Sequence, residues 1–225
     1  MKKMKMDDDF QSYLVKGALF DGFADIPCML KFKDIVVPKR LAPFTARKRT
    51  KNRETFFHCF IHDFQFSTLI TNTKNHVAEF AGFGGVICPD PTITIGGPRT
   101  INQAQVYFSR AVGFYLQTHG VFAIPCVRWG DVSTYDYCFL GAPKNYIVAI
   151  STHGCIMPCK ENHNELRNAF INGLPVMLDR LTPKYVVVYG RMPKDIFGPY
   201  MKRTQFVHFE SDVQRYYDSK KGGNW

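Results

Sequence analysis

The chain has 225 residues, and its 29 Lys and Arg exceed its 19 Asp and Glu, so the formal net charge is +10. Hydrophobic residues make up 45% and aromatic residues 15%, which excludes an intrinsically disordered chain and predicts a packed core. No apolar run reaches the about 18 residues of a membrane span, and the N-terminus lacks the apolar segment of a signal peptide. We therefore expect a soluble, cytoplasmic protein with no membrane partner.

The positive charge favours a polyanionic partner, a nucleic acid or a nucleotide, because Lys and Arg neutralise phosphates. Many basic proteins carry such a charge for solubility alone, so composition does not decide between the two. The seven cysteines are odd in number, and most lie within apolar runs. This pattern predicts buried thiols in a reducing compartment and no disulfide framework.

Residues 1–54 differ from the rest of the chain. Their short apolar pieces are broken by Gly, Pro and Asp, which predicts an irregular N-terminal segment. The stretch from 39 to 53 holds seven cations and no acid, and two interpretations stay open: a solvated loop, or an arm that contacts nucleic-acid phosphates. The cations of this basic arm are Lys39, Arg40, Arg47, Lys48, Arg49, Lys51 and Arg53.

From residue 55 onward, short β-branched or aromatic runs alternate with helical patterns, which is typical of parallel βα units. The predicted strands are 55–61, 85–88, 121–127, 146–150, 185–189 and 205–209, and the predicted helices lie within 67–80, 100–119, 133–140 and 161–181. Pro175 should kink or end the last helix. We expect an α/β domain over 55–210, with a mainly parallel sheet of five or six strands, as an open sheet or a partial or distorted barrel. A C-terminal tail, 211–225, follows.

Three carboxylates follow three successive predicted strands: Asp63, Asp90 and Asp131. Loops after the carboxyl ends of parallel strands converge on one rim, where ligands bind. The three could hold Mg²⁺ or Mn²⁺, or share general acid and base roles. The alternative for each is a helix N-cap, since Asp is common in βα loops for that reason.

Further ligand-binding candidates lie near the same rim. Arg128 or Arg110 would stabilise the negative charge of a phosphate. Trp129 would either stack on a sugar or base or pack as an ordinary buried aromatic side chain. Arg99 stands beside a glycine pair at a predicted helix N-terminus, which suits a phosphate but equally suits a simple turn and cap. The complete set is Arg99, Arg110, Arg128, Trp129, Ser151 and Thr152.

A second cluster has zinc-type ligands, His153, Cys155, Cys159 and His163. Their number suits tetrahedral Zn²⁺, but the spacing is not one of the standard structural-zinc patterns. The alternative is a loop in which Cys155 packs and His163 faces solvent. A nucleophilic Cys155 would need a base that the sequence does not locate.

An ordered series of motifs resembles a known family. The series comprises Phe57–Phe66, Gly85–Asp90, Ser109–Gln117, Ile124–Asp131, Tyr135–Phe139 and Ser151–Cys155. Over about residues 55–190 it is similar to domain of unknown function 4417, a family associated with phages and mobile elements. The resemblance implies a prokaryotic or viral source, and hence the cytoplasm of a prokaryotic host. His62 stands where a relative's Asp-Asp pair would have an acid, which weakens a two-carboxylate mechanism.

The function we expect is divalent-metal-assisted hydrolysis of a nucleic acid or nucleotide phosphate, by Asp63, Asp90 and Asp131, with Mg²⁺ or Mn²⁺ favoured over Zn²⁺. One alternative is a binding module that holds a nucleic acid or nucleotide without chemistry. Another is a protein that interacts with a host factor.

Overall fold

A computed structural model describes residues 11–156 and 164–215. Its strands form two parallel sheets. The larger sheet has the order β3 (Arg40–Pro43), β4 (Thr55–His58), β5 (Gly85–Ile87) and β6 (Ala123–Ile124), and the smaller has the order β7 (Ile147–Ser151), β8 (Tyr185–Tyr189) and β9 (Gln205–Phe209). A short antiparallel pair, β1 (Phe20–Asp21) and β2 (Ile26–Pro27), lies apart from both. Along both sheets, neighbouring strands follow one another in chain order.

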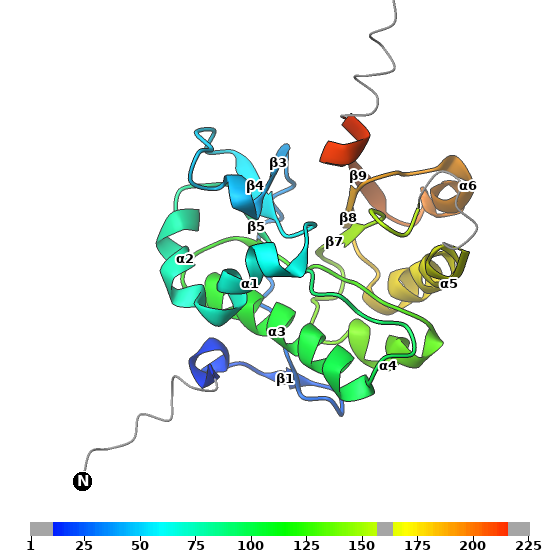
Figure 1. Ribbon diagram of the computed structural model, residues 1–225, viewed down its shortest axis with the longest axis horizontal. Helices are drawn as coiled ribbons and strands as arrows, with labels where there is room; N and C mark the ends of the chain where they lie inside the picture. The colour runs from blue at the N-terminus through cyan, green and yellow to red at the C-terminus, as the bar shows by residue number, and fades with distance from the viewer. Residues whose placement is uncertain (1–10, 157–163, 216–225) are drawn as a thin grey trace, which may run out of the picture.

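Helices surround the strands in an arc that passes from α2 through α3 to α5 and α6 (Figure 1). They are α1 (Asp63–Thr71), α2 (Thr73–Phe80), α3 (Arg99–Thr118), α4 (Tyr135–Cys138), α5 (Asn164–Leu181) and α6 (Lys194–Phe197). The helices predicted near 100–119 and 161–181 are thus confirmed. Pro175 lies inside α5, so the predicted early end of this helix is wrong, and a kink at Pro175 stays a prediction. Within the described ranges, the model has no helix both long and apolar enough to span a bilayer.

All six predicted strands are present, but they are not one sheet of five or six strands. The predicted strand 121–127 pairs with β5 only over Ala123–Ile124. Pro125 comes next, and proline has no N–H to donate to a ladder. A single parallel bridge then joins Cys126 to Ala149 of β7, with Val127 N–H donating to Ala149 O at 2.8 Å. The two sheets therefore meet edge to edge at this bridge.

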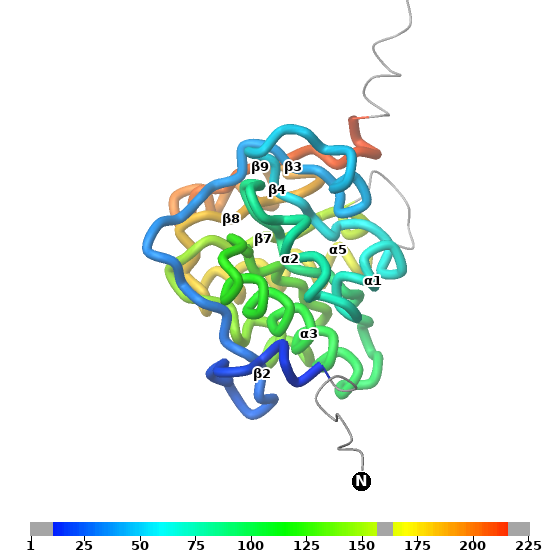
Figure 2. The backbone as a smooth tube through the Cα atoms, turned by 90° about the vertical axis from the view of Figure 1, so that its left-hand side faces the viewer, coloured from blue at the N-terminus to red at the C-terminus, as the bar shows by residue number. Residues whose placement is uncertain are grey.

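The basic arm contributes a strand that the sequence analysis did not predict. Arg40–Pro43 forms β3, which pairs in parallel with β4 along its whole length. A short 3-10 helix, η2 (Phe44–Ala46), follows it and buries Phe44. The segment expected to be irregular thus provides the first edge of the larger sheet. Figure 2 shows this edge close to β9, the edge strand of the smaller sheet.

Both faces of the strands are buried. In β7, Ile147 and Ala149 pack with the aromatic core of the larger sheet, whereas Val148 and Ile150 pack against α5 and its neighbours. Strands with two covered faces are continuously apolar in parallel sheets. This explains the unbroken runs from which β7 and β8 were predicted.

Arg110 is the largest side chain that the core buries completely. It comes from α3, is 1% exposed, and donates to the carbonyl oxygens of Cys126 at 2.6 Å, Leu140 at 3.1 Å and Cys138 at 3.2 Å. Burial lowers the pKa of its guanidinium. The sequence analysis proposed Arg110 as a phosphate contact. The structure instead gives it a structural role, because its donors serve backbone carbonyls around the end of β6.

We predict that Arg110→Met lowers the free energy of unfolding by about 3 kcal/mol, because three buried carbonyls lose their donor. Urea denaturation followed by circular dichroism measures this change. The control is Arg191→Met, since the side chain of Arg191 is exposed. A loss of less than about 0.5 kcal/mol in Arg110→Met would contradict the assigned role.

Candidate functional site

A cleft of about 530 Å³ lies where the carboxyl ends of the strands meet. Every strand from β4 to β9 supplies a residue at or after its carboxyl end. These residues are His62 and Gln65 after β4, Asp90 and Thr92 after β5, Arg128 after β6, Ser151 and His153 at β7, Tyr189 at β8, and Asp212 after β9. The cleft thus occupies the edge where parallel α/β folds bind ligands.

A buried ion pair forms one wall of the cleft. Arg128 donates from Nε to Asp90 Oδ1 at 2.6 Å and from Nη2 to Oδ2, and Cys126 Sγ donates to the same carboxylate at 3.2 Å. The Asp90 side chain is 2% exposed and that of Arg128 is 29% exposed. Burial disfavours the charge of Arg128, but Asp90 outweighs this effect and raises the pKa of the guanidinium. Arg128 is therefore a fixed cation that is partly open to the cleft.

The other two predicted carboxylates have separate partners. Asp63 accepts from Thr92 N–H at 3.0 Å and holds the loop after β5. Asp131 caps η3 (Val132–Thr134), accepting from Ser133 N–H at 3.0 Å and Oγ at 2.5 Å. Among the described residues, no group of three His, Cys, Asp or Glu side chains could hold a metal ion. The capping alternative is confirmed for Asp131, and the structure does not bring Asp63, Asp90 and Asp131 together.

Two histidines flank Tyr189, which lines the cleft. His153 lines the cleft as well, whereas His58 is 1% exposed and is not among its lining residues. The ring of His58, at the end of β4, lies 4.4 Å from that of Tyr189, and the ring of His153 lies 6.4 Å from it. Burial lowers the pKa of His58 to about 4, and His58 Nδ1 accepts from Phe60 N–H at 3.2 Å. For His153, burial and then Arg128 and His62 lower the pKa. Both imidazoles are therefore neutral at neutral pH in the unliganded protein.

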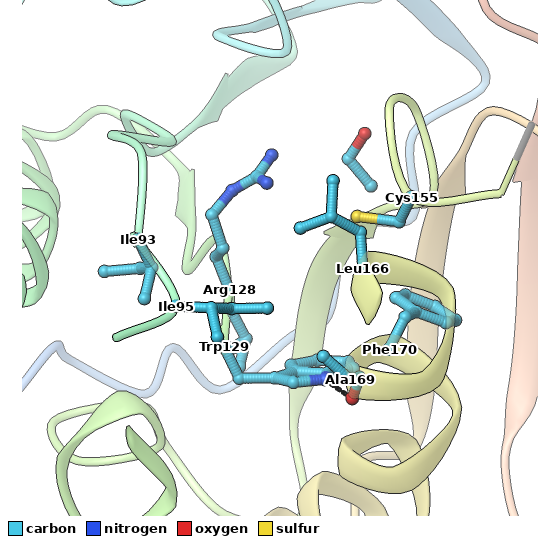
Figure 3. A pocket seen from close by; sticks show the side chains of 10 residues that line it. Ile93, Ile95, Arg128, Trp129, Cys155, Leu166, Ala169 and Phe170 are labelled. Atoms are coloured by element: carbon cyan, nitrogen blue, oxygen red, sulfur yellow. Dashed lines mark hydrogen bonds between the residues drawn. The ribbon is translucent and has the colours of Figure 1, made fainter. Parts of the chain in front are cut away.

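An apolar side pocket adjoins the cleft and shares Arg128 and Ser151 with it (Figure 3). Its other walls include Ile93, Leu166 and Phe170. The pocket is small, at about 40 Å³.

Trp129 has the packing role that was the alternative to base stacking. It is 9% exposed, stacks on Phe170 at 5.3 Å, and donates from Nε1 to Ala169 O at 3.1 Å. Gly173 makes room for it, since a Cβ there would lie 2.1 Å from Nε1. The ring faces of Trp129 are therefore not offered to a ligand in the cleft.

Half of the predicted zinc cluster lies outside the described residues, namely Cys159 and His163. His153 lines the cleft, and Cys155 lines the side pocket. Burial raises the pKa of the Cys155 thiol, although Arg128 opposes this effect. Cys155 is therefore a thiol at neutral pH, which does not favour it as a nucleophile. The six cysteines within the described part of the chain are free, as expected.

The remaining ligand candidates divide between the cleft and other surfaces. Ser151 lines the cleft and accepts from His153 N–H at 3.1 Å. Thr152 is buried and donates to Arg191 O at 2.7 Å. Arg99 pairs with Asp136 at 2.5 Å on the outer surface, away from the cleft.

The cations of the basic arm fall into two groups. Arg47 pairs with Glu79 at 2.6 Å, Arg53 stacks over the ring of Phe83 at 4.5 Å, and Lys39 lies 3.6 Å from Glu54. The other four are exposed and have no ion pair within the ranges that the structure describes; they are Arg40, Lys48, Arg49 and Lys51.

Tyr189 and Asp212 line the cleft but are not among the predicted site residues. Tyr189 ends a predicted strand and Ser151 follows one, so the position of Tyr189 could have indicated it as a site residue. Asp212 follows the last strand, which the sequence indicated least clearly.

We predict that Asp90→Asn and Arg128→Gln each lower the free energy of unfolding by about 3 kcal/mol, and that the double variant loses less than their sum. Removing one partner leaves the other buried without its counter-charge. Chemical denaturation of the four proteins measures the coupling. Arg203→Gln breaks the exposed pair with Asp179 and should cost less than about 1 kcal/mol. Strict additivity at Asp90 and Arg128 would contradict the assignment.

We predict that His58 makes the protein less stable in acid. The unfolded state takes up a proton on this histidine below its ordinary pKa of 6.5, whereas the folded state takes it up only near 4. Stability is therefore lost as the pH falls between these values, by about 3 kcal/mol. The free energy of unfolding of the unsubstituted protein should fall more steeply between these pH values than that of His58→Phe. If the two curves have the same slope between these pH values, the assignment to His58 is wrong.

Comparison with known proteins identifies phage relatives. The chain is 32% identical to the Gene 1 protein of Mycobacterium phage D29 over 135 residues, which are 60% of this chain and 48% of that protein. It is 30% identical to the Gene 1 protein of Mycobacterium phage L5 over 135 residues, 60% of this chain and 57% of that protein. The chain thus spans about half the length of the curated relatives it matches. No solved structure matches it.

The family resemblance and its phage association are confirmed. The sequence profile of one family matches residues 18–210, a longer range than the motifs suggested, and it includes β3 and the basic arm. The chain belongs to the family described as domain of unknown function (DUF4417).

Proposed function

We propose that this phage-family protein binds a nucleotide in the cleft at the carboxyl ends of β4 to β9, with the phosphate against Arg128. The observation that carries the proposal is the convergence of six parallel strands on a cleft that contains a fixed, partly open guanidinium. The cleft volume of about 530 Å³ is within the range of small-molecule sites. The proposed place of action is the cytoplasm of a bacterial host.

The chemistry of the lining supports a phosphate ester. A guanidinium has five N–H donors, and the pair with Asp90 uses two nitrogens, so donors remain for an anion. His62 and His153 are exposed imidazoles on the same cleft, and His153 would gain a proton beside a phosphate. Gln65 offers an amide that can hydrogen-bond a sugar or base.

Metal-assisted hydrolysis is not part of this proposal. It would need Asp63, Asp90 and Asp131 to share an ion, whereas Asp131 is a helix cap and Asp90 is paired with Arg128. Binding requires no such rearrangement. We therefore propose ligand binding and assign no reaction.

We predict that a nucleoside monophosphate binds more tightly as the pH falls from about 7.5 to 5.5. Protonated His153 favours a bound anion, and its pKa in the free protein is below the ordinary value. His153→Ala should weaken binding about tenfold, equivalent to about 1.4 kcal/mol, and flatten the pH dependence. Isothermal titration calorimetry with the four common monophosphates measures both effects.

The matched control is His119→Ala, because His119 is exposed at the end of α3 and does not line the cleft. It should leave affinity and pH dependence unchanged. If none of the monophosphates binds, or if His153→Ala binds them as the unsubstituted protein does, the proposed function is wrong.

A further inference from the structure

The two sheets, joined at the Cys126–Ala149 bridge, form one row of strands from β3 to β9. This row does not close, so it has an open side between its two edge strands, β3 and β9. β3 pairs only with β4, and β9 pairs only with β8, among the residues described. A groove of about 410 Å³ lies between them and is lined by Lys39–Ala42 on one side and His208–Glu210 on the other. Figure 1 shows β3 and β9 at opposite ends of the row, on the side that the arc of helices leaves uncovered. We call this groove the seam.

The seam carries a positive surface. Lys39, Arg40 and Arg215 line it, with Glu210 as the acidic side chain among its lining residues. Lys39 and Arg215 are each paired with an acid, but side chains 78% and 58% exposed gain little from such pairs, about 1 kcal/mol or less. A phosphate can therefore replace either acid. Arg40 is exposed and without an ion pair in the described ranges.

The seam and the cleft share a wall. Tyr189 lines both, and the segment after β9 places Asp212 on the cleft and Arg215 on the seam, three residues later. Phe209, which is partly buried, gives the seam an aromatic side chain on which an unpaired base can stack, whereas Tyr189 is 4% exposed and stacks on Phe60 inside the protein. A ligand that fills the cleft can thus continue into the seam without leaving the protein surface.

We propose that the ligand of the cleft is the end of a single-stranded nucleic acid, whose backbone continues along the seam over Lys39, Arg40 and Arg215. This inference rests on the proposed nucleotide site and names its substrate class. A row of cations beside the aromatic side chain of Phe209 matches the repeating phosphates and bases of a single strand, whereas a free nucleotide has too few phosphates to contact the seam. The exposed cations Lys48, Arg49 and Lys51 follow β3 along the chain.

The experiment compares thymidine monophosphate with a fluorescein-labelled oligothymidylate of about 8 nucleotides, and with the matching oligouridylate. Calorimetry measures the affinity for the monophosphate. Fluorescence anisotropy measures the affinity for the two oligonucleotides at several salt concentrations. We expect the oligonucleotide to bind at least about tenfold more tightly than the monophosphate. In Lys39→Gln with Arg40→Gln that gain should disappear, and the salt slope should fall by about 1.4, because two phosphate contacts are lost.

The control variant, Lys144→Gln with Lys184→Gln, removes the same charge from exposed lysines that precede β7 and β8, at the opposite ends of the strands. It should bind the oligonucleotide as the unsubstituted protein does. Thermal unfolding confirms that both double variants are folded. A difference between oligothymidylate and oligouridylate assigns DNA or RNA as the source of the strand.

The results test the nucleotide site and the seam separately. If the monophosphate binds and the oligonucleotide gains nothing, the seam inference is wrong and the nucleotide site stands. If a labelled polyglutamate peptide binds through Lys39 and Arg40 while the oligonucleotide does not bind, the seam binds an acidic peptide and the inference is wrong. If neither monophosphate nor oligonucleotide binds, the proposed function and the inference both fail.

Discussion

The buried guanidinium of Arg110 is the interaction on which the arrangement of the strands and the cleft depends. It donates to Cys126 O, where the chain leaves β6, and to two carbonyls around α4. Cys126 also forms the bridge to Ala149 that joins the two sheets. Burying this charge is costly, and three hydrogen bonds offset the cost only in one arrangement of α3, β6 and α4. Arg128, two residues beyond Cys126, is thereby directed to the cleft.

The cleft and the seam follow from the same strand arrangement. Parallel strands in chain order bring their carboxyl ends to one edge, so residues distant in sequence, such as Asp90 and Arg128, form a buried pair there. Proline at 125 interrupts the ladder between the sheets, and the row of strands does not close between β3 and β9. A closed barrel would have no free edges. The open side leaves the cations of β3 beside the segment that follows β9.

Much of the fold was accessible from local patterns, while the site was accessible only in part. The continuous apolar runs predicted β7 and β8 because both of their faces are covered, and the helix through Val106 and Leu116 was predicted by its periodicity. β3 was not predicted because Arg40, at its start, belongs to a run of cations that is typical of a solvated loop. Asp131 and Asp63 were grouped with Asp90 because all three follow strands. Local sequence does not reveal that Asp131 folds back on Ser133 while Asp90 meets a guanidinium 38 residues away.

The amino-acid sequence by itself determined the α/β class, the order of strands and helices, and the family, since these depend on periodicity and ordered motifs within short stretches. It also determined that Arg128 and Asp90 stand at strand ends. Only the tertiary structure decided which strand-end residues share a cleft, that Arg110 and Trp129 support the core, and that the basic arm begins as an edge strand. Those outcomes depend on contacts between distant segments, where burial and hydrogen-bond partners, and not local propensity, select the role of each side chain.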